Sequence, residues 1–476
     1  MDKLLFNMKR VLTLFFLSLT AISLMGQETE NNQVVLLEKE FDKIDGSWSG
    51  KLSLGINSLA LCFNIINESD KTICTLDVPE QGGVGIPTEL VLLTDKEIEI
   101  YVPNLGLKYK GVRKSSDIIE GTFSQHGIEL PLILNPGKLK ANRPQTPKKP
   151  YLYRSEEVTF YNEAEGATLK GTLTYPMLEY RYAKGSIPVV VMVTGSGGQN
   201  RDEELFDHKP FLVIADYLAK CGIASLRYDD RGVGESTGPT YNMTTLNIKS
   251  DAEAAVNYLK SLNEFGKVGV LGHSEGGTIA FMLGGDNCVD FIVSLAGASV
   301  KGIDILVDQN RVQLEQRGLN KDLANSHSTV LRAIFEDRIN KVQVTDNEKY
   351  ISEICAKNSI VLPTEIQSSL SNFITFGGIW LDWFLAYDPA EAIKKIKVPV
   401  MAINGDLDLQ VISKSNLKVL EDNLEPNSKN LIKEYPSLNH LFQHCNYADA
   451  LNYWKNEETI SPEVLKDIAN WINSIK

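Results

Sequence analysis

Two short segments share the pattern Gly-x-Ser-x-Gly, which in one protein fold places a nucleophilic serine on a sharp turn between a strand and a helix. Ser236 lies in GESTG at 234–238, and Ser274 lies in GHSEGG at 272–277. The turn requires a buried strand before it, a helix after it and glycines beside the serine, because larger side chains would meet the backbone. KVGVL precedes Ser274 and GTIAFML follows it, whereas Ser236 stands between YDDRGV and Pro239. We therefore predict that Ser274 is a nucleophile and that Ser236 is a turn residue.

A serine nucleophile needs a base and an acid that orients the base, and with this pattern both follow the serine along the chain. His440 in SLNHLF follows the expected final strand NLIKEYP, and His444 lies one helical turn further on, where we expect a surface residue. VPVMAINGDLDLQV offers Asp406 and Asp408; a Gly-x-x-Asp turn favours Asp408 and leaves Asp406 a turn-stabilising or neighbouring role. His440 would take the Ser274 proton and return it to the leaving group, while Asp408 would fix the imidazole tautomer.

Such chemistry also needs backbone N–H groups that stabilise the negative charge of the tetrahedral intermediate. One donor is expected to be the N–H of Glu275, directly after the nucleophile. The other is expected in VTGSGGQNRDE, where glycines let the backbone turn toward the charge; we select Ser196, with Gly197 as the alternative. The same GSGG lacks the lysine and the spacing of a phosphate-binding loop, and the other interpretation of it is a flexible turn.

The elements that must position these residues follow Tyr151. Apolar runs such as IPVVVMVTG, KVGVLG and VPVMAING alternate with helical stretches, which indicates a parallel sheet covered by helices and the α/β class. In SDAEAAVNYLKSL, Ser250 and Glu253 predict a capping box at the start of a helix. The alternation is interrupted at about 299–388 by polar helical sequence, which predicts a cap over the active-site end of the strands.

The region before the α/β part has a different texture. Residues 38–135 contain short alternating segments such as KLSLGI and EIEIYV, which predict a small all-β domain, and the proline-rich 136–150 predicts a linker. Cys62 and Cys74 are expected on the two arms of one hairpin, and their even separation predicts a shared face. There they could form a disulfide or remain two buried thiols.

Composition and the N-terminus limit location and partners. Residues 1–26 combine positive residues with the apolar run VLTLFFLSLTAISLM, which predicts a cleaved signal peptide and a periplasmic or secreted protein. A retained N-terminal anchor is the alternative. The formal net charge of −13 disfavours nucleic acid and anionic membrane surfaces as partners. The cysteines lack metal-ligand spacing, so we expect no metal.

Together these motifs resemble the exported bacterial α/β-hydrolases of the EstD esterase type, relatives of dienelactone hydrolase and of the prolyl-oligopeptidase catalytic domain. The resemblance covers most of residues 151–476 and implies a carboxylic-ester hydrolase with Ser274, Asp408 and His440 as its triad and no cofactor. Gly198-Gln199-Asn200 departs from the Pro and Asp that relatives often carry, which leaves the exact oxyanion donor open. The motifs that carry the resemblance are VTGSGGQNRDE, RYDDRGVGESTG, GHSEGG, NGDLDLQV and LNHLF.

Further positions match the resemblance without a fixed role. The charged residues Arg201, Asp202, Asp229 and Arg231 are expected to form salt bridges that brace loops rather than to contact substrate. The cap aromatics Trp380, Trp383 and Phe384 could line an acyl pocket or form the core of the cap.

Two other functions remain open at this point. The same fold and triad support a serine peptidase, although Asp202, Glu203 and Glu204 do not form a clear pair that would grip a peptide amine. A binding protein that has lost activity is the second alternative. The expected partner is a small ester; acyl length and oligomeric state are not encoded in any motif.

Overall fold

The computed structural model describes residues 43–54, 57–67, 71–78, 83–125, 127–138, 141–375 and 377–475. The predicted signal peptide at 1–26 therefore lies outside the described residues. The chain divides into two compact units between residues 142 and 143. No helix in the described part is long and apolar enough to cross a membrane.

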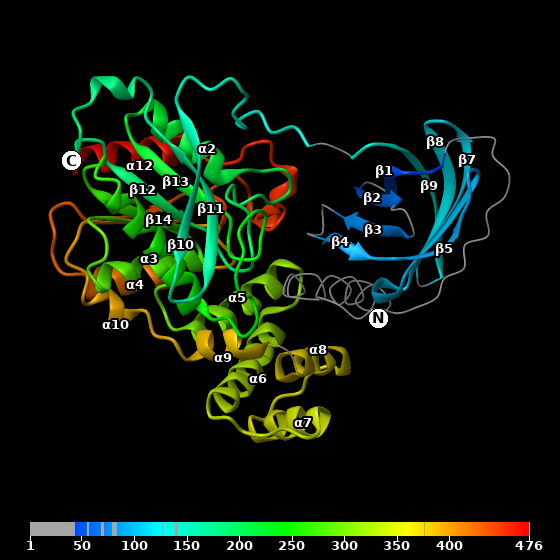
Figure 1. The fold of residues 1–476 in the computed structure, drawn as a ribbon. Coiled ribbons are helices and arrows are strands. Elements are labelled where there is room, and N and C mark those ends of the chain that lie inside the picture. The colour runs from blue at the N-terminus through cyan, green and yellow to red at the C-terminus, as the bar shows by residue number, and fades with distance from the viewer. Residues whose placement is uncertain are drawn as a thin grey trace. The chain divides into compact units, whose positions relative to one another are not determined.

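The first unit is all-β, as predicted. Its nine strands form an antiparallel sheet in the order β4-β3-β2-β1-β9-β8-β7-β6-β5 (Figure 1). Alternate side chains pack inward around Phe63 and Tyr109, whose rings stack with centroids 5.5 Å apart. The strands are β1 (Gly46–Leu54), β2 (Asn57–Asn67), β3 (Thr72–Val78), β4 (Gly83–Pro87), β5 (Glu89–Leu93), β6 (Glu97–Val102), β7 (Leu107–Ser115), β8 (Ile118–Gln125) and β9 (Ile128–Pro136).

The register of β2 and β3 corrects the expectation for the two cysteines. Cys62 pairs with Asp77, and Cys74 pairs with Ile65. Since Cys74 lies an odd number of residues from Asp77, the two thiols are on opposite faces of the sheet. Both are buried free thiols, so the alternative without a disulfide is the one the structure shows. An even separation along the chain does not determine a shared face, because the turn length sets the pairing.

The second unit contains an eight-stranded sheet in the order β10-β11-β13-β12-β14-β15-β16-β17. The first two strands join it antiparallel, and the pairs from β13 to β17 are parallel. The strands are β10 (Ser155–Asn162), β11 (Ala167–Thr174), β12 (Val189–Val193), β13 (Ala224–Tyr228), β14 (Val268–His273), β15 (Ile292–Leu295), β16 (Val400–Gly405) and β17 (Leu431–Tyr435).

Helices cover both faces of this sheet, as the apolar strands predict (Figure 1). One face packs on α2 (Pro210–Lys220) and α12 (Pro462–Ser474). The other packs on α3 (Thr245–Ser261), α4 (Glu275–Gly285), α10 (Ala390–Ile393) and α11 (Ser413–Asn423). Short 3₁₀ helices lie at η2 (Pro103–Leu105) in the first unit and at η3 (Glu179–Arg181), η4 (Tyr447–Asp449) and η5 (Tyr453–Lys455) in the second.

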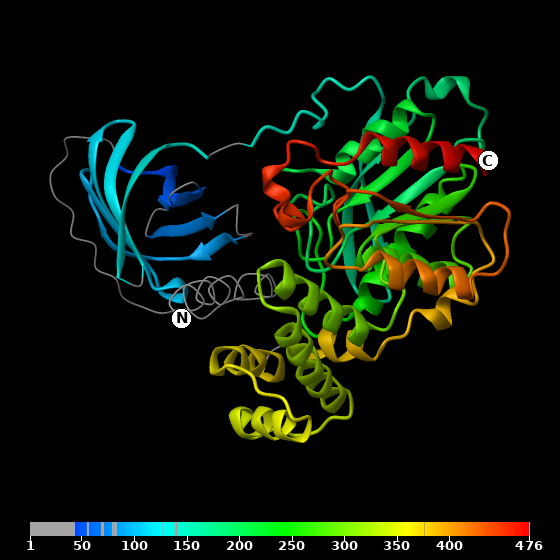
Figure 2. The same cartoon turned by 180° about the vertical axis from the view of Figure 1, so that it is seen from behind.

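The insertion between β15 and β16 is helical, as predicted for a cap. Its helices form a group of their own beside the sheet, drawn from green to yellow in Figure 2, with an apolar core that includes Leu331, Phe335 and Leu370. They are α5 (Gly302–Gln316), α6 (Lys321–Ile339), α7 (Asn347–Lys357), α8 (Thr364–Thr375) and α9 (Gly378–Ala386).

Two boundaries differ from the sequence-based expectations. Helix α3 begins at Thr245, and its capping box is formed by Thr244 and Asn247 rather than by Ser250 and Glu253. Part of the predicted linker also packs on the second unit. The Arg143 guanidinium donates to main-chain carbonyls around Phe206 and Trp454, and the Gln145 amide donates to the Ile460 carbonyl.

Candidate active site

Ser274 lies on a strained turn between β14 and α4. Its backbone has φ 54° and ψ −117°, a conformation that non-glycine residues rarely adopt. A Cβ on Gly272 would lie 1.9 Å from the Gly276 carbonyl oxygen, and one on Gly276 would lie 2.1 Å from the Val193 carbonyl oxygen. The glycines therefore permit the close packing that holds a half-buried serine at the end of the strand.

Ser236 has a different environment. It lies in a loop, and its buried hydroxyl donates to the Asp229 carbonyl oxygen at 2.7 Å. The same hydroxyl oxygen accepts from the Lys170 N–H at 2.9 Å. Because both partners are main-chain groups of neighbouring segments, this serine joins the loop to the sheet.

His440 and Asp408 are brought together by the loops after β17 and β16. Nδ1 of His440 lies 2.8 Å from Oδ2 of Asp408, and both residues are buried. The other oxygen of Asp408 accepts from the N–H groups of Gln410 and Val411 at 2.8 and 2.9 Å. With Nδ1–H donating to an acceptor-only carboxylate, Nε2 of the neutral imidazole is left as the proton acceptor.

The neighbouring candidates have the roles expected of them. His444 is exposed and pairs with Glu458 at 2.8 Å. Asp406 accepts from the Ser437 N–H at 2.6 Å and so stabilises the turn that leads to His440.

The segments that carry Ser274 and His440 are adjacent. His273, which precedes the serine, has its ring centroid 4.7 Å from that of His440. The loop after β12 also approaches the serine, because a Cβ on Gly195 would lie 3.3 Å from the Ser274 Cβ. Three of the sequence-predicted segments therefore meet at the carboxyl ends of the parallel strands.

The candidate oxyanion donors lie in this region. Glu275 is the first residue of α4, where a helical N–H has no partner within the helix. In the loop after β12, the Gly195 N–H is bound by the Glu203 carboxylate and the Gln199 N–H by the Asp230 carboxylate, each at 2.8 Å. Among the described residues, no acceptor engages the N–H of Ser196 or of Gly197, so both expected candidates for the second donor stay open.

Buried carboxylates brace this loop, and sequence reasoning did not identify two of them. Asp230 accepts from the Thr194 hydroxyl at 3.0 Å and from the Gln199 N–H, and burial raises the pKa of this carboxyl to about 7. Glu203 binds Gly195 from a backbone with φ 52°. Asp230 stands in RYDD and Glu203 in RDEE, but no spacing in the sequence indicates which carboxylate turns inward.

The predicted charged braces are ion pairs. Arg201 binds Asp229 through two nitrogens, at 3.1 and 2.7 Å. Asp202 pairs with Arg227. Arg231 binds the buried Asp251 through Nε and Nη2, both at 2.7 Å.

The cap touches the serine turn through Trp380. Its indole N–H donates to Oε1 of Glu275 at 3.0 Å, and its ring stacks on Phe384 at 5.0 Å. Trp383 stacks instead on Tyr387 at 4.6 Å. Trp380, Trp383 and Phe384 pack in a small apolar cluster with Ala298 and Val411. They therefore form the contact between the cap and the rest of the second unit, which we call the sheet unit.

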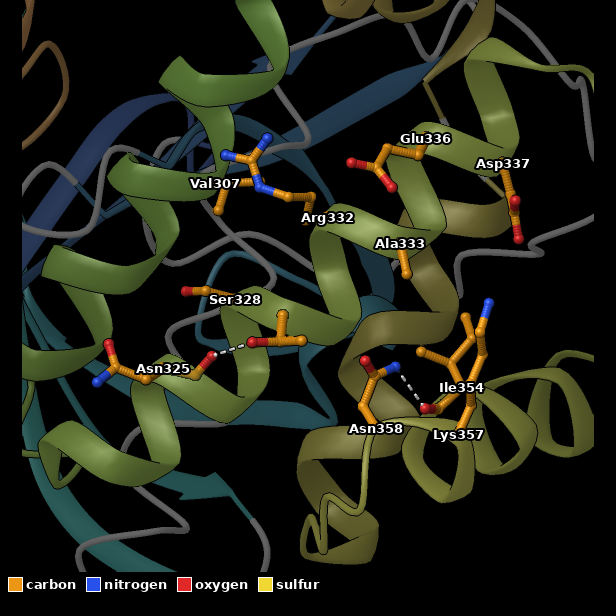
Figure 3. Close-up of a pocket in the computed structure, with 11 residues that line it drawn as sticks. Val307, Asn325, Ser328, Arg332, Ala333, Glu336, Asp337, Ile354, Lys357 and Asn358 are labelled. Carbon is orange, nitrogen blue, oxygen red and sulfur yellow. Dashed lines mark hydrogen bonds between the residues drawn. The ribbon is translucent and has the colours of Figure 1, made fainter.

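A cavity of about 510 Å³ lies within the cap, between α5, α6 and α7. Figure 3 shows Arg332, Glu336 and Lys357 among the side chains that line it. None of the residues predicted to be catalytic lines this cavity, so it is separate from the serine turn. In the described part of the chain, no group of three or more His, Cys, Asp or Glu side chains could hold a metal ion.

The strand order, the helices on both faces and the strained serine turn after β14 define the second unit as an α/β-hydrolase. Comparison with known proteins agrees with this class. Residues 209–444 match the family described as "Serine aminopeptidase, S33", and this match supports a serine hydrolase.

The chain is also similar to a curated relative, the esterase EstD of Thermotoga maritima. The two are 25% identical over 304 residues, which cover 64% of this chain and 65% of that esterase. The chain therefore spans just under two thirds of the relative's length. This match confirms the resemblance drawn from the motifs.

Solved structures with a similar chain path include Est1E of Butyrivibrio proteoclasticus and the proline iminopeptidase of Mycobacterium smegmatis. They are 14% and 13% identical, with TM-scores of 0.38 and 0.41. Each covers 67% of this chain, and the alignments take in 99% and 98% of those chains. Similarity at this level carries no inference about activity.

Proposed function

We propose that this protein is a serine carboxylesterase that hydrolyses small to medium acyl esters, with Ser274 as nucleophile, His440 as base and Asp408 as the acid that orients the base. The observation that carries the proposal is the 2.8 Å bond between His440 Nδ1 and Asp408 Oδ2, next to the segment that holds Ser274 in a strained turn. The similarity to a protein named an esterase supports the choice of an ester substrate.

The reaction follows from these groups. Nε2 of His440 takes the Ser274 proton as the serine oxygen attacks the ester carbonyl, and Asp408 stabilises the imidazolium that forms. The N–H groups of Glu275 and Ser196 would bind the oxyanion of the tetrahedral intermediate. Collapse of the intermediate expels the alcohol, which receives the proton from His440. Water then attacks the acyl-enzyme by the same route and releases the acid.

The test is hydrolysis of p-nitrophenyl esters from acetate to decanoate by the mature protein. We expect Ser274→Ala to lower kcat by about 10⁶-fold, the size seen when a triad nucleophile is removed. Ser236→Ala is the matched control and is expected to retain turnover, because its hydroxyl is bound to main-chain groups. A wild-type protein without esterase activity, or an active Ser274→Ala variant, would contradict the proposal.

A peptidase of the same mechanism is the second candidate, and the description of the matched family favours it. Aminoacyl p-nitroanilides distinguish the two. If these amides are cleaved with a higher kcat/KM than the esters, and Ser274→Ala abolishes both activities, the peptidase assignment replaces the esterase assignment.

A further inference from the structure

Glu203 joins three segments of the candidate active site, although the sequence analysis gave this last residue of VTGSGGQNRDE no catalytic role. Its Oε1 accepts from the Gly195 N–H at 2.8 Å and lies 2.8 Å from Nδ1 of His273. Nε2 of His273 lies 3.0 Å from the carbonyl oxygen of His440. One buried carboxylate is thus linked to the loop after β12, to the serine turn and to the histidine loop.

The number of protons shared by Glu203 and His273 follows from the groups that their polar atoms face. Nε2 of His273 faces a carbonyl oxygen, which only accepts, so Nε2 carries a proton. Nδ1 faces a carboxylate oxygen that already accepts from the Gly195 N–H. A second proton must therefore lie between Nδ1 and Oε1, on one atom or the other. The pair is neutral overall and holds one proton more than an ionised glutamate beside a neutral histidine.

The surroundings support retention of this proton. Burial alone lowers the pKa of His273, but the Glu203 carboxylate outweighs this effect and the pKa lies above its ordinary value. The charged and titratable groups that face the pair are Asp408, Asp230 and the tilted ring of His440. Of these, Asp408 also raises the pKa of His273.

We propose that Glu203 and His273 form a positioning pair for the Ser274 reaction. The pair holds the loop after β12 and the main chain of His440 in fixed positions relative to the Ser274 nucleophile. The proposal rests on the proposed function. The pair touches no reacting atom: it acts through Gly195 on the loop that carries Ser196, and through the His440 carbonyl on the base. A small displacement of such groups costs about 100-fold in rate, because the reacting atoms must be aligned.

Glu203→Gln is the central variant, since glutamine keeps the length of the side chain but cannot share the proton. A neutral amide and a neutral imidazole cannot maintain all three contacts, so at least one of the three segments is released. We expect kcat on p-nitrophenyl esters to fall by about 10- to 100-fold with KM nearly unchanged. Glu204→Gln is the matched control, because the same change one residue on affects an exposed carboxylate.

A spectroscopic measurement separates positioning from general stability. Wild type and Ser274→Ala should both show a low-field imidazole N–H proton resonance from His273, and Glu203→Gln should lose it. If the Gln variant does not fold, the wild-type spectrum and its loss on His273→Gln decide the assignment of the proton.

Two results would overturn the proposal: a Glu203→Gln enzyme with wild-type kcat, or the absence of the His273 resonance from the folded wild type. Failure of the esterase proposal looks different, since the wild type would then hydrolyse no ester while its His273 resonance remained.

Discussion

Two buried histidines show how differently the sheet unit and the cap are held together. His273, under the serine turn, has a hydrogen-bond partner on each ring nitrogen. His327, on the cap helix α6, is also buried, and neither of its ring nitrogens has a hydrogen-bond partner among the described residues. An unpaired buried polar group costs about 1–3 kcal/mol, so the cap tolerates a cost that the polar network near Ser274 avoids.

This difference reflects the kind of contact that determines the structure of each region. Near Ser274, the carboxylates of Glu203, Asp230 and Asp408 each bind backbone N–H groups, which fixes loops to within a hydrogen-bond length. The described cap helices pack mainly through apolar contacts, which set burial but few directions. Substitutions near Ser274 should therefore affect activity most, and substitutions in the apolar core of the cap should affect stability alone.

Among the variants that test this comparison of the two regions, Asp408→Asn is expected to have the largest effect. An asparagine in the same position would stabilise the wrong tautomer of His440, so that Nε2 could no longer accept the serine proton. From the general behaviour of such triads, kcat should fall by about 10⁴-fold with little loss of stability. Ester hydrolysis and thermal unfolding check both parts, with Asp406→Asn as the control. A fall in kcat of the same size in the control would contradict the assignment of Asp408.

A second effect concerns Asp230. Burial raises its pKa to about 7 from 3.8, so the folded protein holds a proton that the unfolded chain releases. This contribution to stability is complete below about pH 4 and is lost as pH rises through 7. Asp230→Asn mimics the protonated acid and should remove that loss, which amounts to a few kcal/mol.

Urea unfolding between pH 4 and pH 8 measures the Asp230 effect. The stability difference between Asp230→Asn and wild type should grow in favour of the variant as pH rises. A constant difference over this range would show that Asp230 stays ionised in the folded protein.

His327→Leu tests the cap side of the comparison. Desolvation lowers the pKa of His327 to about 4, so the neutral side chain contributes stability above pH 6.5 that is lost as pH falls toward 4. Leucine removes both this loss and the unpaired nitrogens, and we expect a gain of about 1–3 kcal/mol with unchanged kcat.

His208→Leu is the matched control for His327→Leu. Burial also lowers the pKa of His208 to about 4, but its ring nitrogens contact Thr459 and the Tyr453 carbonyl at 2.9 and 3.1 Å. The same substitution there leaves these partners unpaired and should destabilise the protein. If both variants changed the free energy of unfolding equally, the number of hydrogen-bond partners of the histidine would not explain the difference between the two regions.

The sequence predicted those features that local sterics determine. The glycines around Ser274 and the turn before Asp408 place both residues without knowledge of distant segments. The His273 contact of Glu203 and the partners of Asp230 were not predictable in this way, because they come from strands and loops far along the chain. The face of Cys74 was predicted incorrectly because it depends on the pairing register, and the start of α3 because Thr244 and Asn247 offered a cap before Ser250 did.

The smallest effect is expected where the two regions meet. Trp380→Phe keeps the stacking on Phe384 and removes one hydrogen bond, that from the indole N–H to Oε1 of Glu275. Within the described part of the chain, the other oxygen of this buried carboxylate has no partner, and the loss at Oε1 leaves only the Thr245 hydroxyl as a donor. Because Glu275 also supplies a candidate oxyanion N–H, we expect a several-fold fall in kcat/KM and a loss of about 1–2 kcal/mol of stability.

Trp383→Phe serves as the control for the Trp380 variant, since its ring stacks on Tyr387 and its exchange leaves Glu275 untouched. Esters of increasing acyl length, assayed with both variants, show whether the cap contact acts on Glu275 or on the acyl chain. A uniform fall across the series for Trp380→Phe alone supports an effect through Glu275. A fall confined to long acyl chains would instead assign Trp380 to the acyl pocket, and the cap would then specify substrate directly rather than through the serine turn.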